Sequence, residues 1–225
     1  MSPAETDPTL LDEPLGSVAR PSWRGRLHLI ALWSAVPLLL VLAIVSNGAR
    51  SRAAVIVYGV GLCSMLAVST IYHRWVHTIR ARAAWRRADH ATIFAAIGGT
   101  CTAIALTTLS TGPAIAMLVV IWTAAAIGAA FKVASFHRAH RLGSVMYIAL
   151  GWSGLALAPS VWHRGGGLAF GLLLAGGIIY TAGAAAFGHQ WPTLRPAKFS
   201  YHEVWHTLTI AAAALHFAAI STLAT

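Results

Sequence analysis

The stretch 201–206 reads Tyr-His-Glu-Val-Trp-His and contains the pattern H-E-x-x-H. Positions four residues apart lie on one face of a helix, so His202 and His206 can bind one metal ion, as two imidazoles do in zinc metalloproteases. The alternative is that both are histidines packed in a helical core. Catalytic zinc generally takes three protein ligands and leaves a fourth position to water, so the pattern predicts only part of a site.

A second group of polar side chains lies much earlier in the chain. Ser69 and His73 are also four positions apart, and Asp89 and Glu203 are the two carboxylates outside the first 21 residues. Ionisable groups within or beside a membrane span are costly and are functional candidates by default. Simpler interpretations exist, because His73 can cap a helix end, and Asp89 can be an N-cap, a helix-dipole partner or an ion-pair partner of nearby arginines.

Membrane-spanning helices must position these residues. The 225 residues are 57% hydrophobic and 10% charged, with a mean hydropathy of +0.68, whereas soluble domains are about 25% charged. A helical span needs about 20 apolar residues. We predict an all-α membrane protein, a seven-transmembrane-helix bundle over residues 22–225 behind a disordered, acidic and Pro-rich tail at residues 1–21. The predicted spans are 27–47, 53–73, 89–109, 113–134, 142–162, 167–188 and 202–223.

The distribution of basic residues predicts the orientation. Of the 16 Lys and Arg residues, three (Arg50, Arg52 and Arg164) lie in the first, third and fifth loops, and the others precede the first span or lie in the second, fourth and sixth loops. Cytoplasmic loops carry the excess, so we expect a cytoplasmic N-terminus and an outside C-terminus. The net charge of +10 therefore indicates topology rather than nucleic-acid binding. This topology brings residues 73, 89 and 202, from three helices, to one cytoplasmic depth.

Several short motifs occur together in one order along the chain. The motifs are Ser-Thr-Ile-Tyr-His at 69–73, Asp-His-Ala-Thr-Ile-Phe at 89–94 with Gly-Thr at 99–100, Gly-Trp at 151–152, Gly-Ile-Ile-Tyr-Thr-x-Gly at 177–183, and the stretch 201–206. In this combination the sequence resembles the hemolysin III family, the bacterial branch of the progestin and adiponectin receptor (PAQR) superfamily, over essentially all seven spans. At the first span, the run Trp-Arg-Gly-Arg-Leu-His at 23–28 replaces the acidic and Asn residues that commonly precede the histidine in the family.

The resemblance implies a zinc ion near the cytoplasmic face of the bacterial inner membrane. Its ligands would be His73, His202 and His206, Asp89 would hold the water at the zinc, and Ser69 would lie close by. Zinc lowers the pKa of a bound water toward about 7 and polarises a carbonyl. We therefore expect hydrolysis of a lipid amide or ester that enters from the bilayer, and a similarity to alkaline ceramidases implies an amide such as a ceramide.

Other interpretations remain beside this hydrolase. Glu203 occupies the position of the base in zinc metalloproteases, but it lies about 100° around the helix from His202, so we favour Asp89 as the base and expect Glu203 to hold a neighbouring His or Arg. A membrane-embedded protease is a further interpretation. A second class is a non-catalytic lipid sensor or receptor with a structural zinc, and a third is a pore-forming cytolysin. No motif specifies an oligomeric state.

Overall fold

The computed structural model describes residues 21–134 and 140–225, so all of the predicted tail except Pro21 lies outside the described residues. The described residues form helices joined by short connections, with one isolated bridge between Arg195 and Phe199. The helices are α1 (Arg26–Val45), α2 (Gly48–Arg74), α3 (Ile79–Thr108), α4 (Thr111–Ala134), α5 (His140–Trp152), the 3-10 helix η3 (Ser153–Leu157), α6 (Ala158–Gly188) and α7 (Tyr201–Ala224).

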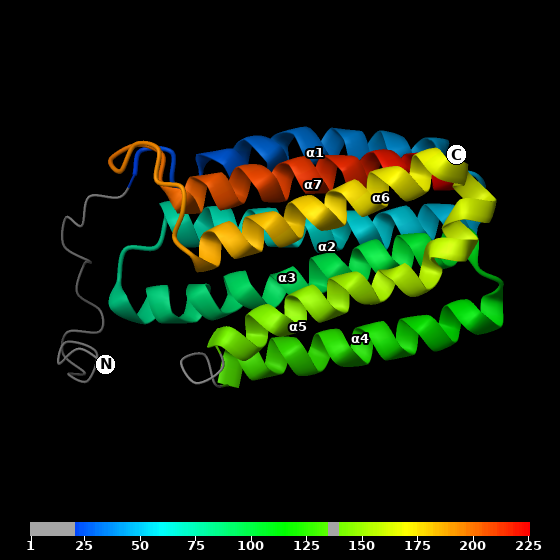
Figure 1. Ribbon diagram of the computed structural model, residues 1–225, viewed down its shortest axis with the longest axis horizontal. Coiled ribbons are helices and arrows are strands. Elements are labelled where there is room, and N and C mark those ends of the chain that lie inside the picture. Colours follow the sequence, from blue (N-terminus) through cyan, green and yellow to red (C-terminus); the bar gives the residue numbers. More distant parts are fainter. Residues whose placement is uncertain (1–20, 135–139) are drawn as a thin grey trace.

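Six helical stretches among the described residues are long and apolar enough to cross a membrane. Five of them, α1 to α4 and α7, correspond to predicted spans. The sixth predicted span, and the fifth from Val145 onward, fall within the continuous stretch Val145–Gly188. The α-helical geometry in this stretch changes at η3 and is broken at Gly166, whose φ of 63° suits a residue without a side chain. Figure 1 shows that α5 and α6 run in opposite directions along the bundle.

Helix α3 begins at Ile79, well before the predicted start of the third span. Its N-cap is Thr78, whose side chain accepts a hydrogen bond from the backbone N–H of Ala81 at 3.2 Å. Asp89 therefore lies about three turns inside the helix, and the N-cap interpretation of Asp89 is wrong. Sequence hydropathy missed the extension because its first turns are rich in arginine.

Small residues let the helices that carry the site approach each other closely. A side chain at Gly61 of α2 would lie 2.6 Å from the backbone oxygen of Ala95 in α3. On the other side of the bundle, a side chain at Gly183 of α6 would lie 3.0 Å from the ring of Trp205 in α7. Such close approach is how membrane helices associate, and it fixes α3 against α2 and α7 against α6.

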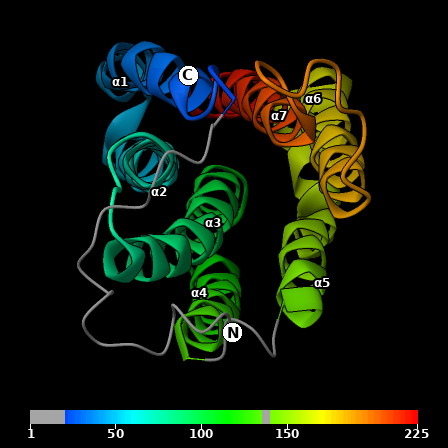
Figure 2. The same cartoon turned by 90° about the vertical axis from the view of Figure 1, so that its left-hand side faces the viewer.

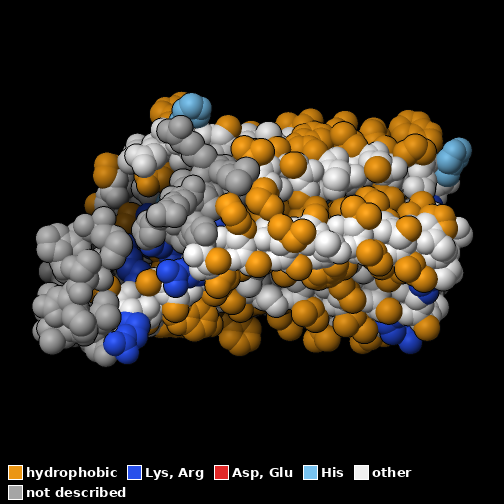
Figure 3. Space-filling model, turned by 90° about the horizontal axis from the view of Figure 1, so that it is seen from below, with side chains coloured by type: hydrophobic (Ala, Val, Ile, Leu, Met, Phe, Trp, Pro, Cys, Tyr) orange, Lys and Arg blue, Asp and Glu red, His pale blue; other side chains and the backbone are white. Residues whose placement is uncertain are grey.

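The outer surface of the bundle suits a lipid environment. Large apolar side chains point outward along its length, among them Trp33 (75% exposed), Ile44 (74%) and Leu168 (67%). In the face shown in Figure 3, hydrophobic side chains cover the middle, whereas Lys and Arg side chains gather toward the two ends. This distribution is expected of a protein whose middle is surrounded by acyl chains.

The two ends of the bundle are held by different contacts. At one end the backbone N–H of Ser22, which precedes α1, donates to Ala197 in the loop before α7 at 3.2 Å. At the other end the N–H of Asn47 donates to Ala224 at 2.8 Å. Figure 2 looks along the bundle from the first of these ends and shows α1 between α2 and α7. The starts of α1 and α7 and the end of α2 therefore meet there.

Candidate metal centre

The start of α7 is built to present two histidines. Ser200 is the N-cap: its side chain accepts from the backbone N–H of His202 at 3.3 Å, and Glu203 Oε2 accepts from the N–H of Ser200 at 2.8 Å. This reciprocal capping box fixes the first turn of the helix. His202 and His206 follow on one helical face, and His206 is buried at 3% exposure.

The third histidine comes from the end of α2. The three imidazoles of His73, His202 and His206 each offer a ligand atom within 4.8 Å of the others. The Nε2 atoms of His73 and His202 are 3.2 Å apart, and the three ring centroids are separated by 4.6, 4.7 and 5.1 Å. Two nitrogen ligands at about 2.0–2.1 Å from a tetrahedral zinc lie about 3.3 Å apart. This largely buried group can hold a metal ion and consists of the three residues that the sequence predicted.

Asp89 and Ser69 flank this group. Asp89 Oδ2 lies 3.9 Å from Nε2 of His73, and the Asp89 side chain is 16% exposed. The Ser69 hydroxyl, one turn before His73 on α2, hydrogen-bonds the Asp89 side chain, and Ser69 is 2% exposed. The carboxylate therefore lies against the edge of the histidine group, with one hydrogen bond that orients it.

Glu203 has a different environment from Asp89. Its Oε1 accepts from Arg24 Nε at 2.5 Å, and its Oε2 accepts from the backbone N–H and the hydroxyl of Ser200, the latter at 2.5 Å. The side chain is 2% exposed. Oε1 thus holds the start of α7 to the segment before α1, and Oε2 closes the capping box at Ser200. This agrees with the expectation that Glu203 holds a neighbouring basic residue.

His28 of α1 lies directly on the histidine group. Its ring is stacked on that of His206, with centroids 3.9 Å apart and an angle of 11° between the planes. It is 3% exposed, and neither of its ring nitrogens has a hydrogen-bond partner among the described residues. The sequence supported only a weak link between His28 and the site. The available signal was an imidazole in the first turn of an apolar helix at the end where the other histidines lie.

His90 is a neighbour of Asp89 and lies outside the three-histidine group. Its Nδ1 is 2.9 Å from the carbonyl oxygen of Arg86 and 3.9 Å from Asp89 Oδ2. The Tyr147 hydroxyl of α5 donates to the carbonyl oxygen of His90 at 3.0 Å. The hydrogen bond from Tyr147 ties the α3 turn that carries Asp89 to the helix α5.

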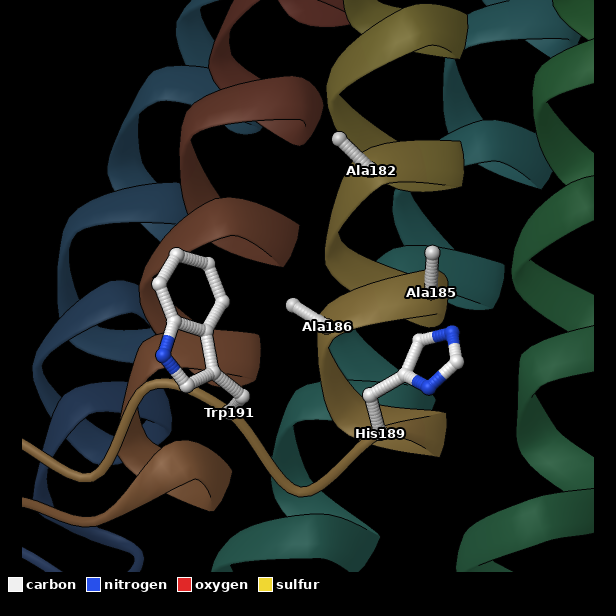
Figure 4. A pocket seen from close by; sticks show the side chains of 5 residues that line it. All are labelled: Ala182, Ala185, Ala186, His189 and Trp191. Carbon is white, nitrogen blue, oxygen red and sulfur yellow. The ribbon is translucent and has the colours of Figure 1, made fainter.

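Among the described residues, one cavity lies at the end of α6 and another lies beside α3. One of about 470 Å³ is shown in Figure 4; it lies on the last turns of α6 and the loop that follows, and none of the three histidines lines it. Its lining residues are Ala182, Ala185, Ala186, His189 and Trp191. The other, of about 460 Å³, is apolar and is lined by residues of α3, α4, α5 and the adjoining turns, including Phe94 and Met146.

The helical bundle, its apolar exterior and the buried histidine group define a multi-pass membrane protein with a potential metal site. The family model described as "Haemolysin-III related" matches residues 17–217, so the chain belongs to the hemolysin III family. It is 31% identical over 193 residues to "Hemolysin-3" of Bacillus cereus, which covers 84% of this chain and 85% of the relative. It is 25% identical over 193 residues to "Hemolysin-3 homolog" of Bacillus subtilis (strain 168), covering 84% and 87%. These matches and the apolar helices support a location in the bacterial cell membrane.

Proposed function

We propose that the protein is a zinc-dependent hydrolase of a lipid amide or ester, similar to a ceramidase, that works at the cytoplasmic side of the bilayer. The observation that carries the proposal is the meeting of three imidazoles from α2 and α7 with the Ser69–Asp89 pair from α2 and α3. Three neutral imidazoles are a usual ligand set for a catalytic zinc. A carboxylate beside them, free of the cation that neutralises Glu203, is suited to act as a base.

In the proposed hydrolysis, the metal ion, Asp89 and Ser69 have different roles. When bound, the zinc supplies a Lewis acid that polarises the carbonyl and makes water a better nucleophile. Asp89 Oδ2 accepts a proton from the attacking water as the water oxygen bonds to the carbonyl carbon. Asp89 then delivers this proton to the leaving nitrogen as the carbon–nitrogen bond breaks. The hydrogen bond from Ser69 orients the carboxylate throughout.

The proposed topology counts α5 and α6 as separate crossings, giving seven, with the metal centre at the cytoplasmic end. The opposite directions of α5 and α6 support this count (Figure 1), and the excess of Lys and Arg at the loops of the metal end supports the orientation. A single cysteine introduced at Thr225 should react with a membrane-impermeant maleimide in intact cells. A cysteine at Ser22 should react only after the cells are opened. Cys63 and Cys101 are changed to Ala first, so that only the new thiol is labelled.

Metal analysis of detergent-purified protein tests the proposal. We expect about one zinc per chain, lost in His206→Ala, and release of fatty acid from a panel of lipid amides and esters. A folded wild-type protein without metal would exclude the mechanism. A protein that retains zinc but releases no fatty acid from the panel would favour the lipid sensor with a structural zinc.

The names of the relatives favour a second candidate, a lytic activity on membranes. Purified protein would then release a dye from lipid vesicles at the same rate in the wild type and in Asp89→Asn, because pore formation does not need the carboxylate. Leakage that depends on Asp89 would instead attribute lysis to lipid hydrolysis.

A further inference from the structure

His28 is buried in a way that apolar packing does not explain. Its two ring nitrogens are enclosed and lack hydrogen-bond partners among the described residues, and its exposure is 3%. An unsatisfied buried polar atom costs stability. A phenylalanine or leucine would cover His206 equally well without that cost, so the nitrogens themselves point to a ligand.

The fold holds His28 in this position from three sides. Before α1, Arg24 binds Glu203 of α7, and the N–H of Trp23 donates to Lys198 at 3.3 Å. Gly25 has a φ of 73°, and a side chain there would lie 2.9 Å from Cβ of His73. The first turn of α1 is therefore packed between the end of α2 and the start of α7, and this packing places His28 against the histidine group.

His28 lies beside the metal ligands but is not one of them. It is absent from the group whose ligand atoms all lie within 4.8 Å of one another, and its ring is parallel to that of His206 rather than turned edge-on toward a shared point. A neutral imidazole offers one N–H donor and one nitrogen acceptor. The chemical complement is a polar group with both an acceptor and a donor.

We propose that His28 binds the polar head of the lipid that reaches the metal centre and selects a head that carries a donor as well as a carbonyl, an amide over an ester. This rests on the proposed function. The carbonyl oxygen of either lipid accepts from the His28 N–H, whereas only the amide N–H, or a hydroxyl beside it, donates to the other ring nitrogen. A site built to make a hydrogen bond discriminates strongly against an analogue that lacks the partner.

The test compares His28→Phe, which keeps a flat ring on His206 but removes both nitrogens, with His28→Asn, which keeps a donor and an acceptor. Trp33→Phe is the matched control, because this α1 ring is 75% exposed on the outer surface. The probes are an N-acylethanolamine and the ethyl ester of the same fatty acid. Their affinities are measured by the shift in unfolding temperature in detergent, and zinc content is measured for every variant.

We expect His28→Phe to retain zinc and to lose more affinity for the amide, about tenfold, than for the ester, about threefold, because the ester loses only the hydrogen bond to its carbonyl oxygen. His28→Asn should keep part of the preference, and Trp33→Phe all of it. Loss of zinc in His28→Phe, or an unchanged preference for the amide in that variant, would overturn the proposal. The test measures binding rather than hydrolysis, so its outcome is separate from that of the proposed function. The preference for the amide can be present in a protein that hydrolyses neither probe, and it can be absent from one that hydrolyses both.

Discussion

Arg24 Nε lies 2.5 Å from Glu203 Oε1, so a residue before the first helix neutralises the carboxylate that stands between two histidines of the last helix. The two residues are 179 positions apart in the sequence. In a soluble zinc protease the carboxylate of this pattern is the base. Here the ion pair gives it a structural partner and leaves Asp89 as the carboxylate beside the histidine group.

The ion pair should be visible in the stability of the protein. Arg24→Ala leaves the Glu203 charge buried without its partner and should cost about 3 kcal/mol of unfolding free energy. Glu203→Gln should cost less, because the amide can still contact Ser200 and Arg24 remains partly exposed. In the double variant the cost should be smaller than the sum of the two single costs. Thermal unfolding in one detergent measures all four proteins, and additive costs would show that the pair contributes no coupling.

The histidine group should bind metal as a unit. Replacing His73 or His202 by Ala should reduce zinc from about one per chain to near zero. His189→Ala, at the surface of the α6 cavity, is the control and should keep its zinc. Zinc removal by a chelator should lower the unfolding temperature of the wild type, because ligands that bind only the folded state stabilise it. An equal response of His202→Ala to the chelator would contradict this assignment.

Asp89 and Ser69 should affect turnover rather than metal binding. Asp89→Asn keeps the shape of the side chain but removes the base, so zinc should stay bound while hydrolysis falls by about 10²–10⁴-fold. Ser69→Ala removes only the orienting hydrogen bond and should slow hydrolysis by about tenfold. Full activity in Asp89→Asn, measured as fatty acid released per bound zinc, would exclude Asp89 as the base.

Alanine variants of Gly25 and Gly48 distinguish the cost of backbone strain from the effect of a contact with the histidine group. Both have positive φ, 73° and 78°, but a side chain at Gly25 would lie 2.8 Å from Cγ of Arg74 and 2.9 Å from Cβ of His73, whereas one at Gly48 meets nothing within 4 Å. Alanine at either position should cost about 1–2 kcal/mol of stability from the backbone. Only Gly25→Ala should also weaken zinc binding, as measured by competition with a chelator. Equal zinc affinity in the two variants would show that the contact with α2 does not reach His73.

The sequence predicted the members of the histidine group because two local rules carry the information. Spacing of four places His202 and His206 on one face, and Lys and Arg bias brings the end of α2 to the start of α7. The start of α3 was predicted too late. Its first helical turns are rich in arginine, and a criterion based on hydropathy assigns such polar segments to a loop. The boundary between the fifth and sixth predicted spans lies in the stretch Val145–Gly188, whose α-helical geometry changes at η3 and is broken at Gly166.

By itself, then, the sequence determined that this is a helical membrane protein and which imidazoles can share a metal ion, since apolar length and helical periodicity act within one segment. Only the tertiary structure decided that Glu203 is paired with Arg24, that Ser69 bonds Asp89, and that His28 covers His206. The Arg24–Glu203 contact joins the residues before α1 to α7, and the contact of His28 with His206 joins α1 itself to α7, near the other end of the chain. They depend on how α1 is clamped between its neighbours, and neither spacing nor hydropathy within a segment encodes that packing.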